Sequence, residues 1–500
     1  MIAERQDEND VGLAVFGAHR RRHQLGAGGP YASPMASSPA KRFAEIGSDK
    51  PPAGSRAGLG TAIVLGGSVA GMLAARVLAD HAETVVIIER DLVSAGADGR
   101  RGVPQSSQVH ALLSGGSRQL ERWFPGFIAR SVAAGASLVP PERQAMYIDG
   151  VRKVRGADIS LLSGTRPFLE GRIRTELLEL PNVKVVTGQV TGLEIGETAV
   201  AAVRYESGGV AGREPADLVV DAMGRASRLS AWLESAGWER PPVVRVTTGI
   251  NYATAFFHRP PGKHPYGTAL AIPGNMLGEE VSGAVFSAVE GDRWVAMMGG
   301  YGDFRPGSTA ADMIRRFRTQ LPAPFGHVAA NEMAGDVTTY RQADSRRRDF
   351  WACERLPARL AVVGDAVASF NPLYGQGMSS AALHASALSM FLRSSPDLDA
   401  PARDFLALQR VIVDAAWQIS ASKDRSGAGE GDRMPVGDRL ARRIVDLIIQ
   451  ASVTDSAVNA AFQEVTQMLR HPSTLAGPRV VWRAWRARKN PLPAPTPPLG

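Results

Sequence analysis

A glycine-rich turn early in the chain has the residue types and the spacing to hold a phosphate group. It contains Gly66, Gly67, Ser68 and Gly71, and it follows the apolar run from Ala62 to Leu65. Gly66 permits a tight turn, Gly71 permits close packing of the next helix, and the first amides of that helix face a pyrophosphate. Ser68 stands where the pattern G-x-G-x-x-G has its middle glycine. Its side chain leaves a phosphate less room to approach the backbone than glycine would. An ordinary strand-turn-helix is the alternative.

A carboxylate follows at the distance that a dinucleotide site requires. A second apolar run, Thr84 to Ile88, leads to Glu89, eighteen residues after Gly71. A carboxylate at the end of the second strand of a βαβ unit accepts hydrogen bonds from a ribose diol. The turn and the acid together predict a dinucleotide site, but they do not distinguish NAD from FAD.

A second segment, far along the chain, favours FAD. A strand-like run that begins at Leu360 ends in a Gly-Asp pair at Asp365, and an Asn-Pro-Leu-Tyr-Gly-Gln-Gly stretch then leads into an Ala-rich helix. Asp365 can accept a hydrogen bond from a ribityl hydroxyl. Gly375 and Gly377 allow the backbone close to a flat ring, and the helix near Met378 offers amides to the negative edge of a reduced flavin. A capped helix after a strand is the alternative.

These segments resemble the FAD-dependent monooxygenase superfamily that includes aromatic hydroxylases and squalene epoxidases. The similarity spans roughly residues 60 to 420, and its most specific feature is Met378, thirteen residues beyond Asp365. The resemblance implies that Glu89 binds the adenosine ribose and that Asp365 and Met378 hold the ribityl chain and the ring. Further residues that it implies at the cofactor are Arg90, Arg101, Arg166 and Val190, the last on the adenine side.

Two points remain open within this resemblance. Arg172 and Arg174 compete with Arg166 for its role. In the stretch from Asp217 to Ser227, Met223 stands where many aromatic hydroxylases have an aspartate that helps handle FAD and the nicotinamide donor. Direct reduction in the manner of those enzymes is therefore less secure.

Four strings carry a narrower resemblance, to bacterial flavin-dependent epoxidases that oxidise linear polyenes in polyether ionophore biosynthesis. They are Arg101–Gln105, His110–Leu113, Phe124–Gly126 and Asn371–Ala381. Related actinobacterial hydroxylases share several of them. The narrower resemblance implies epoxidation of an apolar polyene, free or bound to a carrier protein, through a C4a-hydroperoxyflavin formed with O2. Electrons would come from NADPH or from a separate flavin reductase.

No catalytic side chain is predicted, because this chemistry requires no protein nucleophile. Side chains that could line a long apolar pocket are Phe256, Phe257, Phe286, Trp294 and Met297. The first alternative is aromatic hydroxylation, for which His110, Tyr252 or His258 could serve as base. Halogenation is disfavoured, since flavin halogenases carry a Trp-x-Trp-x-Ile-Pro string and only Trp294 stands in the comparable stretch. A flavin-binding module without activity, whose helices Arg442–Ile449 and Val480–Arg486 dock a partner or a membrane, is the non-enzymatic alternative.

The elements that must position these residues form an α/β protein. We expect a Rossmann-like FAD-binding domain, an antiparallel β-sheet substrate domain and a helical C-terminal region. The expected division is a disordered extension over 1–57 with Met35 as an alternative start, FAD-binding parts over 58–240 and 351–400, the sheet domain over 241–350, helices over 401–485 and a Pro-rich tail over 486–500. Apolar segments at Val183–Val190, Leu218–Val220 and Leu360–Val363 are expected to join the first sheet.

Composition narrows the function classes. Of 500 residues, 44% are hydrophobic and 21% charged, which is typical of a globular enzyme. The net charge of +8 comes from Lys and Arg interspersed with acids, and no aromatic platform accompanies it, so nucleic-acid binding is not expected. Cys353 is the one cysteine, which favours the reducing cytoplasm and argues against a structural metal site. No apolar run approaches the roughly 18 residues of a membrane span.

Overall fold

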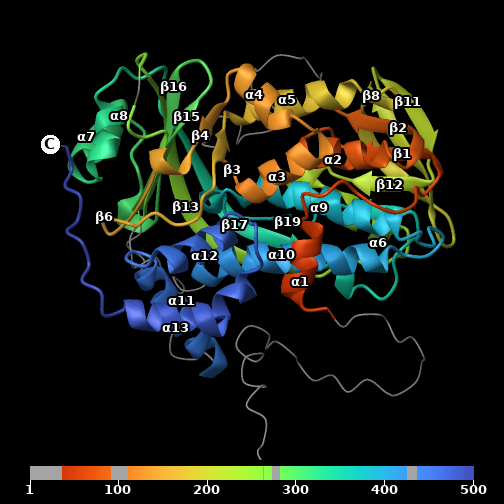
Figure 1. The fold of residues 1–500 in the computed structure, drawn as a ribbon. Coiled ribbons are helices and arrows are strands. Elements are labelled where there is room, and N and C mark those ends of the chain that lie inside the picture. Colours follow the sequence, from red (N-terminus) through yellow and green to blue (C-terminus); the bar gives the residue numbers. More distant parts are fainter. Residues whose placement is uncertain (1–36, 92–110, 263, 273–281, 425–435, 500) are drawn as a thin grey trace, which may run out of the picture.

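The computed structural model describes residues 37–91, 111–262, 264–272, 282–424 and 436–499. Within these ranges a parallel sheet and a larger, mostly antiparallel sheet stand side by side, with helices around both (Figure 1). Arg101, His110 and Met35 lie outside the described residues.

The parallel sheet carries the predicted dinucleotide turn. In spatial order its strands are β18 (Leu360–Val362), β12 (Leu218–Asp221), β1 (Leu59–Leu65), β2 (Ala82–Glu89) and β8 (Val183–Thr187). Every neighbouring pair is parallel. The strands are apolar runs because helices bury both faces of such a sheet, and Ile63, Val64 and Leu65 of β1 have no exposed surface. The predicted βαβ opening and its partner strands are confirmed.

Helices from both ends of the chain cover this sheet (Figure 1). They are α2 (Val69–Leu78), α3 (Ser114–Trp123), α4 (Phe127–Ala133), α5 (Arg166–Leu178), α6 (Leu229–Ser235), α9 (Gln376–Arg393) and α10 (Arg403–Asp424). Helix α9 is buried along most of its length and packs on α2, α3 and α10. The distant second segment is therefore placed beside the first turn by helix packing.

A short helix, α1 (Pro39–Ile46), corrects one prediction. The disordered extension expected over 1–57 is wrong for these residues, because Phe43 and Ile46 are 1% and 0% exposed. They pack in the same core as α9 and α10. Two apolar side chains in eight residues are too few to produce a periodic signal, so only the long-range contact identifies the helix.

The second sheet has eight strands. Their order is β19 (Ala368–Ser369), β17 (Thr338–Arg348), β13 (Val243–His258), β16 (Arg293–Gly300), β15 (Ser282–Val289), β14 (Thr268–Ile272), β5 (Gln144–Ile148) and β6 (Val151–Arg152). The predicted antiparallel layer is confirmed, although β14 and β5 pair in parallel. The expected boundaries at 241 and 350 omit β5, β6 and β19, which join the sheet from outside that range.

Strand alternation divides the side chains that were predicted to line an apolar pocket. Phe257, Phe286 and Trp294 pack in a core with helices α7 (Ala310–Thr319) and α8 (Ala323–Ala329). Met297 lies in a different cluster, on the opposite face of the sheet. Because successive side chains of a strand point to opposite faces, Phe256 also faces away from Phe257. The pocket prediction is thus wrong for the three residues that form this core.

Two small sheets complete the β structure. One contains β11 (Val210–Pro215), β10 (Val200–Ser207) and β9 (Gln189–Ile195), and the other contains β3 (Ala111–Leu112), β7 (Leu161–Ser163) and β4 (Ser137–Val139). Both are antiparallel throughout. The first continues the chain from β8 and returns it to β12.

The C-terminal helices form a separate apolar cluster against β5 and β6. They are α11 (Val436–Ala451), α12 (Ser456–Thr466) and α13 (Pro478–Ala487). The Pro-rich end then runs along the molecule to α8, where Ala323 N–H donates to the carbonyl of Pro497 at 3.0 Å (Figure 1). Across the described residues, no helix combines the length and the apolar character needed to cross a membrane.

Candidate cofactor site

The turn between β1 and α2 requires glycine at two positions. Gly66 has φ +100°, and a Cβ there would lie 2.8 Å from the carbonyl oxygen of Ala222. A Cβ on Gly71 would lie 1.8 Å from the carbonyl oxygen of Gly66. Neither position accepts a larger residue without a backbone shift, so the glycines set how closely α2 approaches β1 and β12.

Glu89 closes this turn from the end of β2. Its side chain is buried, and its carboxylate accepts hydrogen bonds from Gly67 N–H at 2.6 Å and from Asp91 N–H at 3.1 Å. Glu89, which is predicted to bind the ribose, thus contacts the turn that is predicted to bind the phosphate. The neighbouring Arg90 is 58% exposed and pairs with Asp91 at 3.8 Å.

Val190 reaches the same end of the sheet through the backbone. Gly188 N–H donates to the carbonyl oxygen of Glu89 at 2.8 Å, and Val190, two residues later on β9, is buried. The structure therefore places Val190 near Glu89, on the side where the resemblance implies adenine.

The Gly-Asp pair packs directly on the first turn. Gly364 has φ +62°, and a Cβ there would lie 2.5 Å from Cβ of Ala70. Gly364 N–H donates to Nδ1 of His384, a fully buried residue of α9, at 3.0 Å. Burial lowers the pKa of His384 to about 3, so its neutral ring keeps Nδ1 available as acceptor. His384 is a positioning residue that no sequence motif indicated.

The charges of three arginines act on the carboxylate of Asp365. Burial raises the pKa of this carboxyl group, and the charges of Arg166, Arg225 and Arg348 oppose the rise. Arg348 also donates to the carbonyl oxygens of Ala366 at 2.7 Å and of Arg225 at 3.0 Å, which joins the two turns that flank Asp365. Such a cluster is suited to an anionic ligand.

Arg166 lies at the junction of the two predicted segments. Its guanidinium is 3.4 Å from the hydroxyl of Ser68, and its charge acts on Asp365. All three arginines pair with acids of α5: Arg172 with Glu176 at 3.4 Å, and both Arg174 and Arg166 with Glu170 at 3.5 Å. Arg166 combines this pair with its contact to Ser68. Position therefore favours Arg166 for the implied role.

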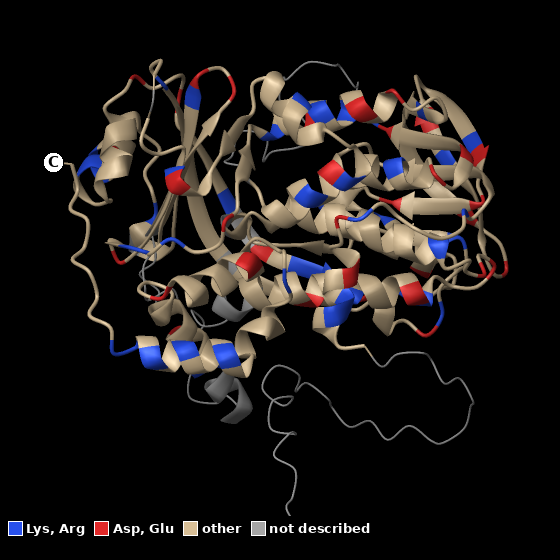
Figure 2. Cartoon of the chain, viewed as in Figure 1, with Lys and Arg blue, Asp and Glu red and all other residues tan. Residues whose placement is uncertain are grey.

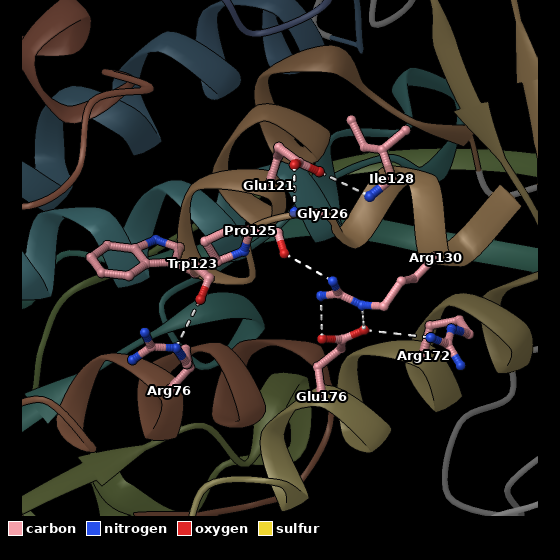
Figure 3. A network of polar contacts seen from close by, with 9 residues as sticks. All are labelled: Arg76, Glu121, Trp123, Pro125, Gly126, Ile128, Arg130, Arg172 and Glu176. Carbon is pink, nitrogen blue, oxygen red and sulfur yellow. Dashed lines mark hydrogen bonds and ion pairs between the residues drawn. The ribbon is translucent and has the colours of Figure 1, made fainter. Parts of the chain in front are cut away.

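The string Phe124–Gly126 belongs to a structural network instead (Figure 3). Glu121 accepts from Gly126 N–H at 2.6 Å and from Ile128 N–H at 2.9 Å, which shapes the corner between α3 and α4. Arg130 then forms a forked pair with Glu176 of α5 at 2.7 and 2.6 Å. These contacts of the string hold α3, α4 and α5 together.

The start of α9 contains a buried amide that lacks a partner. Gln376 is 1% exposed, and within the described residues neither atom of its side-chain amide has a hydrogen-bond partner. Gly375 precedes it with φ +63°, Gly377 has nothing within 4 Å of a built Cβ, and Met378 is buried. A buried amide without partners is costly. The donors and acceptors on the edge of a flavin ring would satisfy it, so these residues fit FAD.

A polar chain links this segment to the second sheet. The hydroxyl of Tyr252 on β13 donates to Oδ1 of Asn371, and Nδ2 of Asn371 lies 3.5 Å from the hydroxyl of Tyr301. Tyr252 and Asn371 are both buried, beside the apolar Ile250 and Met297. The face of the sheet that meets the second segment therefore combines apolar and hydroxyl groups.

Of the two candidate bases that the structure describes, Tyr252 is the one beside this segment. His258 is exposed at the far end of the same strand, about 20 Å along β13 from Tyr252 at 3.3 Å a residue. His110 lies outside the described residues. Among the described residues, no group of three or more His, Cys, Asp or Glu side chains could hold a metal ion.

Comparison with known proteins identifies a relative of this chain. No protein-family model matches the chain. The protein Rv3254 of Mycobacterium tuberculosis is 33% identical over 349 residues, which are 67% of this chain and 73% of that protein. The chain belongs to the family of Rv3254.

The solved structures of two enzymes share the fold of this chain. The p-nitrophenol 4-monooxygenase PnpA of Pseudomonas putida has a TM-score of 0.58 at 17% identity, covering 83% of this chain and 99% of its own. The flavin-dependent brominase Bmp2 has a TM-score of 0.55 at 14% identity, covering 86% and 98%. At these identities the likeness concerns the fold alone. The predicted fold class is confirmed.

In this member of the Rv3254 family, the segment around Met223 adjoins Asp365 through Gly224. A Cβ on Gly224, which has φ +70°, would lie 4.0 Å from Cβ of Asp365. The preceding carboxylate, Asp221, has no exposed surface and accepts from Met223 N–H at 2.9 Å and from the Ser227 hydroxyl. Asp221 thus fixes the turn that supports Asp365, a role the sequence did not indicate.

The burial of Asp221 predicts a pH dependence of stability. Burial raises its pKa to about 6, against the hydrogen bonds from Ser227 and Met223 and the charge of Arg348. The folded state therefore binds this proton more tightly than the unfolded chain. Its stabilising contribution is complete below a pH of about 4 and is lost as the pH rises through about 6.

We expect Asp221→Asn to remove this dependence. Between pH 4 and pH 7, the difference in unfolding free energy between variant and wild type should shift by about 2 kcal/mol in favour of the variant. Denaturant unfolding at several pH values measures it. Parallel curves for the two proteins would show that Asp221 does not titrate in this range.

Proposed function

We propose that this protein is an FAD-dependent monooxygenase that transfers one oxygen atom from O2 to an apolar small molecule. The observation that carries the proposal is the convergence of the two glycine segments, where a Cβ on Gly364 would lie 2.5 Å from Cβ of Ala70. Two turns that each suit one end of a flavin dinucleotide thus form one site. Bound FAD would supply the oxygen-transfer chemistry.

The protein's own part in this function is binding and orientation. The amides at the start of α2 would face the pyrophosphate, and Glu89 would accept hydrogen bonds from the ribose. Asp365 would accept a hydrogen bond from a ribityl hydroxyl. The positive charges of Arg166 and Arg225 would balance the negative charge of the cofactor. Gln376 and the first amides of α9 would pair with the edge of the ring.

We further propose that the substrate is a linear polyene whose alkenes are epoxidised. The apolar side chains beside the second segment, Ile250, Val285 and Met297, support a hydrocarbon substrate. Epoxidation needs no side-chain base, in agreement with the exposed position of His258. Met223, in place of an aspartate, favours a separate flavin reductase over direct use of NADPH as the electron source.

We propose that the protein acts in the cytoplasm. Cys353 is 2% exposed, and the sequence offers it no second cysteine for an internal disulfide. A reducing compartment suits such a chain. The polyether pathway implied by the narrower resemblance belongs to the same proposal.

Aromatic hydroxylation is the second candidate, and the Tyr252–Asn371 contact is the observation that favours it. A hydroxyl held by an amide oxygen could accept a hydrogen bond from a phenol and so orient its ring at this face of the sheet. Hydroxylation of a phenol would use the Tyr252 hydroxyl, whereas epoxidation of an alkene would not. Removing this hydroxyl therefore distinguishes the two reactions.

We expect Tyr252→Phe to lower the kcat of polyene oxidation by less than about tenfold, because alkene epoxidation transfers no proton to this residue. A loss of a hundredfold or more in kcat on a phenol, with KM little changed, would instead assign Tyr252 to hydroxylation. Steady-state kinetics on both substrate classes across the pH range measure the difference.

The decisive experiment supplies the purified protein with FAD, a flavin reductase, NADPH and 18O2. A panel of polyenes and phenols, with and without bromide, is then analysed by mass spectrometry. We expect one 18O atom in a polyene product and a yellow protein with bound FAD. A colourless protein that takes up no flavin, or a brominated product without 18O, would overturn the proposal.

A further inference from the structure

Helix α13 exposes two tryptophans on one face. Trp482 is 55% exposed and Trp485 is 47% exposed. They stand three residues apart, which places them side by side on a helix. Large aromatic side chains rarely remain this exposed unless they meet a partner.

The opposite face of α13 fixes this orientation. Ala484 and Ala487 are buried, and with Val480 they pack against α11 and α12. Arg483 is anchored by Asp455 of the loop before α12 at 3.0 Å. The tryptophans therefore cannot turn inward unless the helix leaves its cluster.

Cations surround the two rings. Arg486 lies 4.7 Å from the ring centroid of Trp482, and Arg488 and Lys489 lie 4.6 and 6.0 Å from that of Trp485. None of these three, nor Arg479, has an acidic partner within 4 Å in the part of the chain that the structure describes. From residue 465 to the end the sequence contains no acid, and Figure 2 shows blue without red on α13.

We propose that this tryptophan and arginine face of α13 binds an anionic phospholipid surface. Indole rings settle at the level of lipid headgroups, and unpaired cations around them are attracted to anionic lipids. This face is a stretch of one helix whose exposed side chains are aromatic or cationic. Its attraction to an anionic surface therefore does not depend on specific, directional hydrogen bonds. Attachment of this kind is peripheral, and a helix of ten residues lies along the surface.

The test measures sedimentation of the full chain with vesicles. Pure phosphatidylcholine vesicles are compared with vesicles that contain phosphatidylglycerol, at low and high salt. We expect partitioning at least about tenfold stronger to the anionic vesicles, and a loss of that preference as salt screens the charges. The emission of Trp482 and Trp485 should shift to the blue on binding.

Two variants and a matched control localise the contact. Trp482→Ala with Trp485→Ala, and the fourfold change Arg479→Gln, Arg486→Gln, Arg488→Gln and Lys489→Gln, should each lower anionic partitioning at least fivefold. Arg213→Gln with Arg240→Gln removes two exposed arginines, both paired with acids, from other surfaces and should leave binding unchanged. Circular dichroism and melting curves verify that every variant is folded.

Three results would overturn the proposal. The wild type could remain in the supernatant with both vesicle types. The control pair could lose binding as strongly as the α13 variants. Sedimentation equilibrium without lipid could show a dimer that Trp482→Ala with Trp485→Ala abolishes, which would assign this face to a second copy of the chain.

Discussion

Replacing Gly71 with alanine is expected to destabilise the fold and abolish flavin uptake together. The added methyl group would lie 1.8 Å from the carbonyl oxygen of Gly66, far inside contact distance. That oxygen belongs to the backbone and cannot rotate away as a side chain can. Helix α2 must therefore shift relative to β1, which costs about 3 kcal/mol or more and moves the amides that would face the pyrophosphate.

Melting curves and flavin fluorescence after gel filtration measure this result. The control is Gly171→Ala, since Gly171 is also helical but has nothing within 4 Å of a built Cβ. This control should be unchanged or slightly more stable, because alanine is favoured over glycine in helices. A Gly71→Ala protein that melts like wild type and retains flavin would show that the close packing at this turn is not required.

Gly377→Ala separates the fold from the cofactor. Gly377 lies in α9 and also has nothing within 4 Å of a built Cβ, so the fold should tolerate a methyl group. If a flavin ring lies against this position, flavin affinity falls while stability is kept. Together with Gly71→Ala, this variant shows whether loss of flavin follows from misfolding or from a blocked site.

Replacing Asp365 with asparagine is expected to weaken flavin binding by roughly 10- to 100-fold. This loss corresponds to one hydrogen bond to a charged group, which contributes about 1.5 to 3 kcal/mol. The amide preserves the shape of the side chain but removes the charge that balances Arg166, Arg225 and Arg348. Because burial raises the pKa of Asp365, the buried charge itself stabilises the folded state little. The flavin-free variant should consequently be as stable as wild type.

Titration of the flavin-free protein with FAD, followed by quenching of flavin fluorescence, gives both affinities. Asp399→Asn is the matched control, because Asp399 is exposed and pairs with Arg359 at 2.6 Å on another surface. An Asp365→Asn protein with wild-type affinity would remove Asp365 from the site. A large loss of stability in the flavin-free variant would make its role structural.

The parallel sheet and the first turn could be predicted because their causes are local. A strand buried on both faces must be a continuous apolar run, as Ala62 to Leu65 is, and a turn that allows no Cβ must carry glycine, as at Gly66 and Gly71. The alternating pattern of the second sheet was visible for the same reason. The face that each side chain would occupy was not, so Phe257 and Trp294 were placed in a pocket although they pack against α7 and α8.

Residue type and spacing alone thus determined the layered α/β plan and the two segments suited to a flavin dinucleotide. Only the tertiary structure decided that α1 packs against α9, that His384 holds Gly364, that Arg166 is the arginine at the junction, and that Gln376 is buried without a partner. Each of these depends on contacts between residues far apart in the chain. Such contacts form only when helices and sheets pack together, so they cannot be predicted from the periodic pattern within one element.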